Sequence, residues 1–397
     1  QRVNLSCISS GFTRAFSNRH PPGTPVLPPK RVAHDEEFTN TKPDTMNIQQ
    51  KITLLLVGTA VCLPGQFQDL KACTRVVYQG PNGTVITGRT MDWRGAIPAD
   101  LWVFPRGMER NGEVGPTSVK WKAKYGSVAT SSFNVATSDG MNEKGLVGNT
   151  LWLVESKYPE FKKGGTQKGL AISLWLQYIL DNFATVDEAV KAFRKEEFVV
   201  VSDFVPGTNM FTTIHVSLSD ATGDNAILEY IDGKLRIHHD RSYTVMTNSP
   251  IFDEQLAINE YWKGIPGTIG LPGTNRAADR FVRGSYYIKA IPQTDNTRVA
   301  VAGVFSVIRN CSVPYGISSP TEPNISNTQW RTVADHKNRV YYFENVLNPN
   351  VVWVEFKNLD FKENAPVKKL SLANNENYAG ESSKNFVNAT PFKFAGL

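Results

Sequence analysis

The first strong pattern of polar and apolar positions in the chain is a β-hairpin over residues 74–93. Runs rich in β-branched residues, TRVVYQ and TVITGRTMDW, flank the sequence PNG at 81–83, and Asn-Gly supplies the positive φ values that a tight turn needs. Antiparallel pairing across this turn places residue 73 roughly opposite residues 90–92. The pattern therefore predicts that the start of the first strand lies beside the end of the second.

Other segments alternate or cluster apolar residues in ways typical of strands and helices. Strands are predicted in SVATSSFNVA (127–136), GLVGNTLWL (145–153), FTTIHVSLSD (211–220), NAILEYIDGKLRIHH (225–239) and NRVYYFENVLNPNVVWVEFKNL (338–359). Helices are predicted over residues 168–182, after a capping box of Thr185 and Glu188, and over residues 277–291. Runs of strands interrupted by helices indicate an α+β fold with antiparallel sheets, and no linker-like stretch divides residues 73–397.

The N-terminal part of the chain differs from this pattern. Residues 1–45 are rich in Pro, Thr and charge without periodicity, and the chain begins with Gln1. We expect either a disordered leader outside the native protein or a genuine N-terminal tail. From Met46, a polar stretch with one lysine precedes an apolar run over residues 52–63, which is typical of a secretory signal and too short for a membrane span. Residues 46–72 are therefore predicted to be a signal and pro-segment removed on maturation, and the mature protein is predicted to be periplasmic or secreted.

Composition and charge narrow the class of protein. Hydrophobic residues make up 41% of the chain and charged residues 20%, as in ordinary globular proteins. The formal charge of +6 is mild and no basic run is interleaved with aromatic residues, which argues against nucleic-acid binding. The six histidines and four cysteines show no metal-ligand spacing, so no metal site is predicted. A processed chain without Cys7 and Cys62 would keep Cys73 and Cys311, too few for a disulfide framework.

The predicted hairpin brings a thiol, a guanidinium and a carboxylate to one end, since Cys73 lies opposite the strand that carries Arg89 and Asp92. One interpretation is a surface Arg–Asp pair beside a buried cysteine. A second is that processing before Cys73 leaves a free α-amine, which titrates at about 7.7–8.0 and can act as the base for its own thiol. Arg89 would then lower the thiol pKa, and Asp92 would accept hydrogen bonds from the amine. A third is lipidation, because LKAC at 70–73 loosely resembles a lipoprotein cleavage box.

Five stretches spread along the predicted mature chain resemble one known family. They are CTRVVY…GRTMDW (73–93), DGMNEKGL (139–146), VMTNSP (245–250), LPGTNRAADRF (271–281) and TQWRTVADHKNRVYYF (328–343). The chain resembles the choloylglycine hydrolases, which include bile salt hydrolases and penicillin V acylases. This resemblance implies an N-terminal-nucleophile (Ntn) amide hydrolase without a cofactor. It also implies a four-layer αββα sandwich with two antiparallel sheets, formed by a single catalytic domain over residues 73–397.

The same resemblance implies roles for particular residues. Cys73 is expected to become the N-terminal nucleophile once the preceding segment is removed, with Arg89 and Asp92 beside it. Asn248, in TNSP, is expected to donate its side-chain amide to the oxyanion. Arg280, in ADRF, is expected to hold the surroundings of the nucleophile.

One expected oxyanion-hole position departs from the family pattern. Family members carry Asn or Tyr there, and counting from DGMNEKGL places Trp152 at this position. An indole cannot replace an amide, so only the backbone N–H of Trp152 can serve, unless Trp152 is plain core. The aromatic residue favours the penicillin acylase side of the family. Met91 and Trp93 are predicted to line an apolar slot for an acyl group, with ordinary packing as the alternative.

The predicted function is hydrolysis of a linear, non-peptide amide bond through a thioester acyl-enzyme. An apolar slot suits the phenoxyacetyl group of penicillin V or the fatty acyl chain of an N-acyl homoserine lactone. Hydrolysis of conjugated bile salts is the alternative, and a secreted or lipid-anchored binding protein without turnover is the alternative of another class. The expected partners are a small-molecule amide with an apolar acyl group and, because family members are often tetramers, three further copies of the chain. Neither nucleic acid nor a stable membrane span is expected.

Overall fold

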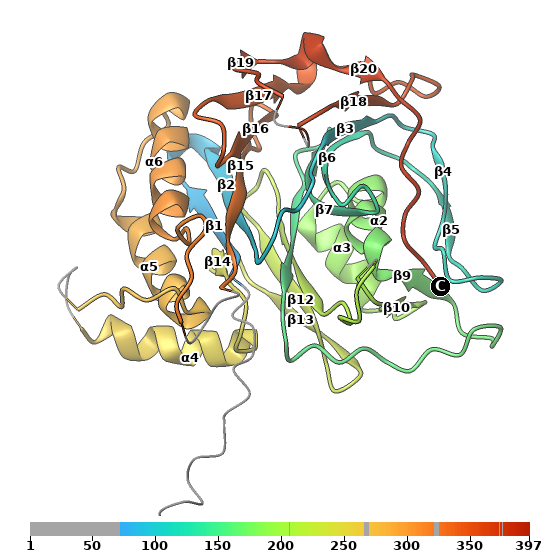
Figure 1. Cartoon of the computed structure of the whole chain (residues 1–397), viewed down its shortest axis with the longest axis horizontal. Coiled ribbons are helices and arrows are strands. Elements are labelled where there is room, and N and C mark those ends of the chain that lie inside the picture. The colour runs from blue at the N-terminus through green and yellow to red at the C-terminus, as the bar shows by residue number, and fades with distance from the viewer. Residues whose placement is uncertain (1–71, 206, 266–269, 321–324, 373, 375) are drawn as a thin grey trace, which may run out of the picture. The chain divides into compact units, whose positions relative to one another are not determined.

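Two large sheets contain most strands of the computed structural model (Figure 1). The structure describes residues 72–397 except 206, 266–269, 321–324, 373 and 375, and these residues belong to one compact unit spanning residues 66–397. The predicted leader and almost all of the predicted signal segment lie outside the described residues. What they do in the native protein stays a prediction.

The first sheet has seven strands and contains the predicted hairpin. Its order is β14 (Val245–Met246), β1 (Thr74–Gln79), β2 (Val85–Trp93), β15 (Asn327–Asp335), β16 (Val340–Asn345), β17 (Val351–Glu355) and β19 (Gly380–Glu381). All neighbours are antiparallel except β17 and β19. Thr74 pairs with Thr90, so the predicted placement of residue 73 opposite residues 90–92 is confirmed. The turn between β1 and β2 contains a single 3-10 turn, η1 (Pro81–Gly83), in which Asn82 and Gly83 have φ values of 52° and 71°.

The second sheet has nine strands, all antiparallel to their neighbours. Its order is β13 (Lys234–His239), β12 (Asn225–Ile231), β11 (Ile214–Ser219), β8 (Val147–Trp152), β7 (Ala136–Asn142), β6 (Ser127–Ser132), β3 (Leu101–Phe104), β18 (Lys368–Leu370) and β20 (Val387–Asn388). The hairpin of β12 and β13 closes through Asp232 and Gly233, both with positive φ, as the sequence predicts. Two smaller pairs join β9 (Gly169–Ala171) to β10 (Val199–Val201) and β4 (Glu109–Asn111) to β5 (Lys120–Lys122).

Helices cover the outer face of each sheet, which gives four layers (Figure 1). The helices α5 (Ala277–Ala290) and α6 (Thr297–Asn310) pack on the first sheet, and α2 (Trp175–Asn182) and α3 (Val186–Phe193) pack on the second. Glycines permit the close approach: a Cβ on Gly88 of β2 would lie 2.6 Å from Val304 of α6, and one on Gly148 of β8 would collide with Leu176 of α2. The expected αββα sandwich is therefore confirmed.

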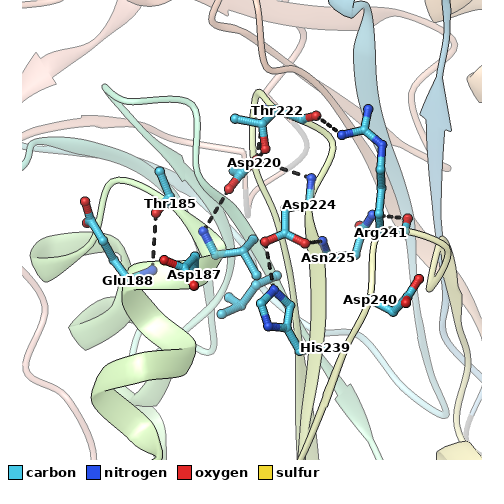
Figure 2. Close-up of polar contacts among 12 residues, drawn as sticks. Thr185, Asp187, Glu188, Asp220, Thr222, Asp224, Asn225, His239, Asp240 and Arg241 are labelled. Carbon is cyan, nitrogen blue, oxygen red and sulfur yellow. Dashed lines mark hydrogen bonds and ion pairs between the residues drawn. The ribbon is translucent and has the colours of Figure 1, made fainter.

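The turn that joins β11 to β12 is hydrogen-bonded to the start of α3 and to the end of β13 (Figure 2). Asp220 accepts a hydrogen bond from the backbone N–H of Val186 at 2.8 Å, and Asp224 lies 2.8 Å from the ring of His239. Asn225 donates to the carbonyl of Arg241 at 3.0 Å and accepts from the buried Arg75 of β1 at 2.5 Å. This network holds β1, the strand that follows Cys73, against the second sheet.

Two predicted elements differ from the structure. Residues 168–182 are not one helix: β9 comes first and pairs in parallel with β10, and α2 begins only at Trp175. The short run GLA is extended and pairs with VVV at 199–201, a partner that lies about 30 residues away in the sequence. The strands predicted at 338–359 exist as β16 and β17, but the chain continues into β18, β19 and β20.

Two helices were not predicted from the pattern. The segment of α6, TRVAVAGVFSVIRN, is rich in β-branched valine, which favours strands. It is helical because Asn296 caps its start by accepting from Val299 N–H and because its apolar face is buried on the first sheet. The helix α4 (Phe252–Lys263) has a weak apolar stripe. Within the described residues, no helix is both long and apolar enough to cross a membrane.

Candidate active site

A cavity that is open to solvent reaches Cys73 between the two sheets. Its walls are largely apolar and include Ile97, Phe133, Ile172, Val201, Val205 and Ile214. Six of the eight residues predicted for the site line it: Cys73, Arg89, Met91, Asp92, Trp93 and Trp152. The other two, Asn248 and Arg280, do not line the cavity but bond to Cys73 from behind. The structure thus brings all eight predicted residues together.

The thiol of Cys73 is held by the backbone of the opposite strand. Its Sγ accepts a hydrogen bond from the N–H of Asp92 at 3.4 Å and lies 3.8 Å from the carbonyl oxygen of the same residue. Burial raises the pKa of the Cys73 thiol above its ordinary value, while Arg89 acts in the opposite direction. Arg89 thus acts on the thiol pKa in the expected direction, but in the described chain, where Cys73 is joined to Ala72, loss of solvation outweighs the attraction of the guanidinium.

The carboxylate of Asp92 is buried and only partly satisfied. Its Oδ2 accepts from the hydroxyl of Thr90 at 3.2 Å, whereas Oδ1 has no hydrogen-bond partner among the described residues. Burial raises the pKa of Asp92 to about 6, although Arg280 opposes the shift. In the described chain the nitrogen of Cys73 is joined to Ala72 and donates to Asn248 instead of to Asp92. The expected contact between Asp92 and this nitrogen is therefore not present in this form.

Asn248 connects the nucleophile to both sheets. It follows β14, the strand beside β1. Its Oδ1 accepts from the nitrogen of Cys73 and, at 3.1 Å, from Arg280. Its Nδ2 donates to the carbonyl oxygen of Trp152 in the second sheet at 2.7 Å. These bonds fix the amide plane, so the orientation of both Asn248 side-chain atoms is set by their partners.

Arg280 reaches the nucleophile from α5. Its Nη1 donates to the carbonyl oxygen of Cys73 and to the hydroxyl of Thr74, each at 2.6 Å, and its Nε donates to Asn275 at 3.0 Å. Burial lowers the pKa of Arg280, against the influence of Asp92 and Cys73. The guanidinium therefore immobilises the backbone at the start of β1, in keeping with the predicted role.

Arg89 contacts groups that were not predicted for the site. It donates to the carbonyl oxygen of Thr150 at 2.7 Å, lies 3.7 Å from Asp139 and stacks 4.6 Å above the ring of Trp330. Asp139 is held in turn by Asn149, Thr332 and Tyr341. Asp139 begins DGMNEKGL and Trp330 lies in TQWRT, so both belong to stretches that carried the resemblance, but nothing in those stretches linked them to Arg89.

Trp93 and Trp152 form one aromatic wall of the cavity. Their ring centroids are 5.5 Å apart with planes inclined at 56°. Trp152 is only 8% exposed, and it both packs in the second sheet and lines the cavity. Met91 contributes its thioether beside Arg89, 3.6 Å from Nη2. Among the described residues, no His, Cys, Asp and Glu side chains are grouped as a set of metal ligands.

A buried thiol at the head of a β-hairpin, enclosed between two helix-covered antiparallel sheets, defines the Ntn-hydrolase class. The chain belongs to the choloylglycine hydrolase family of linear amide C–N hydrolases, whose profile matches residues 73–369. It is accordingly a hydrolase of carbon–nitrogen bonds other than peptide bonds.

Individual relatives agree with this family. The chain is 47% identical over 368 residues to a penicillin V acylase of Pectobacterium atrosepticum, with 87% of this chain and 96% of the relative covered. It is 26% identical over 319 residues to a bile salt hydrolase/transferase of Clostridium perfringens, with 73% and 95% covered. The solved structure of penicillin V acylase from Agrobacterium tumefaciens is similar with a TM-score of 0.77 and 57% identity, covering 82% of this chain and 100% of that one.

Proposed function

We propose that this chain hydrolyses penicillin V and related amides with an apolar acyl group, using Cys73 as an N-terminal nucleophile. The observation that carries the proposal is the position of the Cys73 thiol in an apolar cavity walled by Trp93 and Trp152. Both penicillin V acylases named above support it through their similarity over most of the chain. An aromatic wall suits a phenoxyacetyl group because aromatic pairs add specific contacts to the burial of apolar surface.

In this proposal the chain is cut before Cys73, and the new α-amine takes over the role of base. The amine accepts the thiol proton, and the thiolate attacks the amide carbonyl, forming the S–C bond. The C–N bond then breaks as the ammonium gives its proton to the leaving nitrogen, and the amine product departs. Water, deprotonated by the same amine, attacks the thioester. The S–C bond breaks, and the acid is released with the thiol restored.

Cleavage before Cys73 would also provide a hydrogen-bond donor for the carboxylate of Asp92. A free ammonium carries more N–H donors than the peptide nitrogen does, and Asp92 Oδ1 is a buried acceptor without a partner among the described residues. We assign Asp92 the role of orienting this ammonium, and Arg89 that of favouring the thiolate by its charge. Arg280 holds the carbonyl of Cys73 in place.

Two donors are proposed for the oxyanion. The amide nitrogen of Asn248 carries two hydrogens, and one of them is used by the carbonyl of Trp152. The second hydrogen is assigned to the developing oxyanion, with the backbone N–H of Trp152 as the other donor. Such donors are aimed at charge that exists only in the transition state, so they raise the rate and not the ground-state affinity.

The deciding experiment compares three amides side by side on the mature protein: penicillin V, glycocholate and a long-chain N-acyl homoserine lactone. The proposal expects the highest kcat/KM for penicillin V, with the homoserine lactone as a further substrate. A preference for glycocholate would instead establish the bile salt alternative, which the similarity to the Clostridium relative favours.

Export, maturation and assembly complete the proposal. We propose that the protein is periplasmic or secreted, starts at Cys73 and forms a homotetramer. The intact mass of the protein purified from its native host would identify the first residue, and a mass increment from acyl chains would point to lipidation instead. Light scattering after gel filtration would give the number of chains, and a monomer would contradict the tetramer.

A further inference from the structure

The side chain of Gln255 occupies a buried position behind Asn248. Gln255 lies in the first turn of α4 and is 1% exposed. Its Oε1 faces the N–H and the hydroxyl of Thr247, at 3.4 and 3.1 Å. Its Nε2 donates to the carbonyl oxygen of Asn248 and, at 2.6 Å, to that of Pro250. One amide therefore spans the backbone on both sides of Asn248.

A primary amide suits these contacts. The backbone N–H of Thr247 requires an acceptor and the two carbonyl oxygens require donors, and an amide presents one oxygen and two N–H groups on the same plane. The contacts use both hydrogens of Nε2 and one lone pair of Oε1, because the single hydroxyl hydrogen of Thr247 is donated to Ala277. Residues 247–251, the loop that carries Asn248, belong to no helix or strand, so they are not held by a ladder of backbone hydrogen bonds. The side chain of Gln255 supplies hydrogen bonds to this loop instead.

Thr247 extends this support to the helix that carries Arg280. Its hydroxyl donates to the carbonyl oxygen of Ala277, the first residue of α5, at 2.9 Å. Arg280, one turn along α5, binds Oδ1 of Asn248 and the carbonyl of Cys73. Gln255 and Arg280 thus hold Asn248 from two different helices, the first through its backbone and the second through its side chain.

We propose that Gln255 is a positioning residue that sets the direction of the Asn248 amide toward the oxyanion. The inference rests on the proposed function, because it assigns Gln255 an effect on the oxyanion donor. Gln255 does not itself line the cavity, and its side-chain hydrogen bonds go to Thr247, Asn248 and Pro250, so its influence on rate passes through Asn248. A shift of about 1 Å in a catalytic group can cost roughly a hundredfold in rate.

The test is a double-mutant cycle between Gln255 and Asn248 on the mature protein. Gln255→Leu keeps the approximate volume and removes the hydrogen bonds of the amide, whereas Gln255→Glu keeps the acceptor and turns a second oxygen toward two carbonyls. Each variant is expected to lower kcat about 10- to 100-fold with KM changed less than about threefold, because oxyanion stabilisation acts in the transition state. Glu254→Gln, one residue earlier on the exposed side of α4, is the matched control and is expected to stay within about twofold.

The cycle separates positioning from general support of the fold. In an Asn248→Ala background the same Gln255 changes are expected to alter kcat less than about threefold, since the donor they orient is absent. An equal loss in both backgrounds, or failure of both Gln255 variants to fold, would overturn the inference and assign Gln255 to stability alone. The proposed function is tested separately: an Asn248→Ala variant with undiminished kcat would remove the oxyanion role itself, whatever Gln255 does.

Discussion

The two described cysteines are both buried free thiols, yet only one of them is suited to be a nucleophile. Cys311 directly follows α6 as its C-cap, and burial raises its pKa to about 11. Burial also raises the pKa of Cys73. Arg280 lowers and Asp92 raises the pKa of each thiol, so these two charges do not distinguish them.

The difference between the thiols lies in access and in donors. Cys73 lines a cavity open to solvent and accepts a hydrogen bond from Asp92 N–H, with Arg89 as its further cation. Cys311 has Arg283 as its further cation, but its thiol donates to the carbonyl oxygen of Arg280 at 3.8 Å, and a carbonyl oxygen does not stabilise a thiolate. Local net charge is therefore a poor guide to reactivity here; the tertiary environment of each sulfur decides it.

The contrast between the two thiols is tested most directly by removing each of them. Cys73→Ala is expected to reduce hydrolysis at least about 10⁴-fold, because loss of a nucleophile removes the covalent route. Cys311→Ala should retain kcat/KM within about threefold. Initial rates with penicillin V measure both variants, and Cys73→Ala retaining more than a few per cent of the wild-type rate would refute the assignment.

The next effect concerns the proposed oxyanion donor. Asn248→Ala is expected to lower kcat by about 10²- to 10³-fold, the range found when one such donor is removed. KM should change little, because the donor acts on charge that develops in the transition state. Steady-state kinetics separates the two constants; a rise in KM at constant kcat would make Asn248 a substrate-binding residue instead.

Asp92 gives a pH-dependent stability effect in protein that retains Ala72. Its folded pKa of about 6 lies above the ordinary value of 3.8, so folding favours the protonated form. Its stabilising contribution is present below about pH 3.8 and is lost as the pH rises through 6, by roughly 3 kcal/mol. Urea unfolding from pH 4 to 7 should therefore show Asp92→Asn gaining stability relative to wild type. Parallel pH curves for the two proteins would contradict the raised pKa.

The smallest expected effect is that of replacing Arg89, a cation beside only one of the two thiols. Replacing Arg89 by Met is expected to raise the pKa of the Cys73 thiol further, since a nearby cation that favours the thiolate is lost. The charges that shift the pKa of Cys311 are those of Arg283, Arg280 and Asp92. Alkylation rates of each cysteine against pH, followed by peptide mass, should shift for Cys73 alone. A similar shift at Cys311 would indicate a general loosening of the fold.

The hairpin of β1 and β2 could be predicted from the local sequence pattern alone. Its turn residues and β-branched arms specified the register, and the register alone placed Cys73 opposite the end of β2. The cap of α3 was equally local: Thr185 accepts from Glu188 N–H at 3.2 Å. These features were predictable because their partners lie within a few tens of residues, where chain connectivity limits the possible geometry.

Other elements depended on distant surfaces. The valine-rich α6 is a helix because the first sheet offers it a face to cover, and GLA at 169–171 is a strand because VVV lies beside it. Propensity is a weak prior when burial against another element decides the outcome. No periodicity in either segment carried that information.

The sequence by itself determined the thiol, its hairpin neighbours and, through resemblance, the family and the names of Asn248 and Arg280. Only the tertiary structure decided how they meet: the nitrogen of Cys73 bonds Asn248, 175 residues away, and Gln255 fixes that amide from behind. It also decided the direction of the thiol pKa, which burial raises despite Arg89. Burial and contacts between distant residues exist only in the folded chain. Residue types and spacings could therefore identify the residues of the site, but not their hydrogen-bond partners or the direction of their pKa shifts.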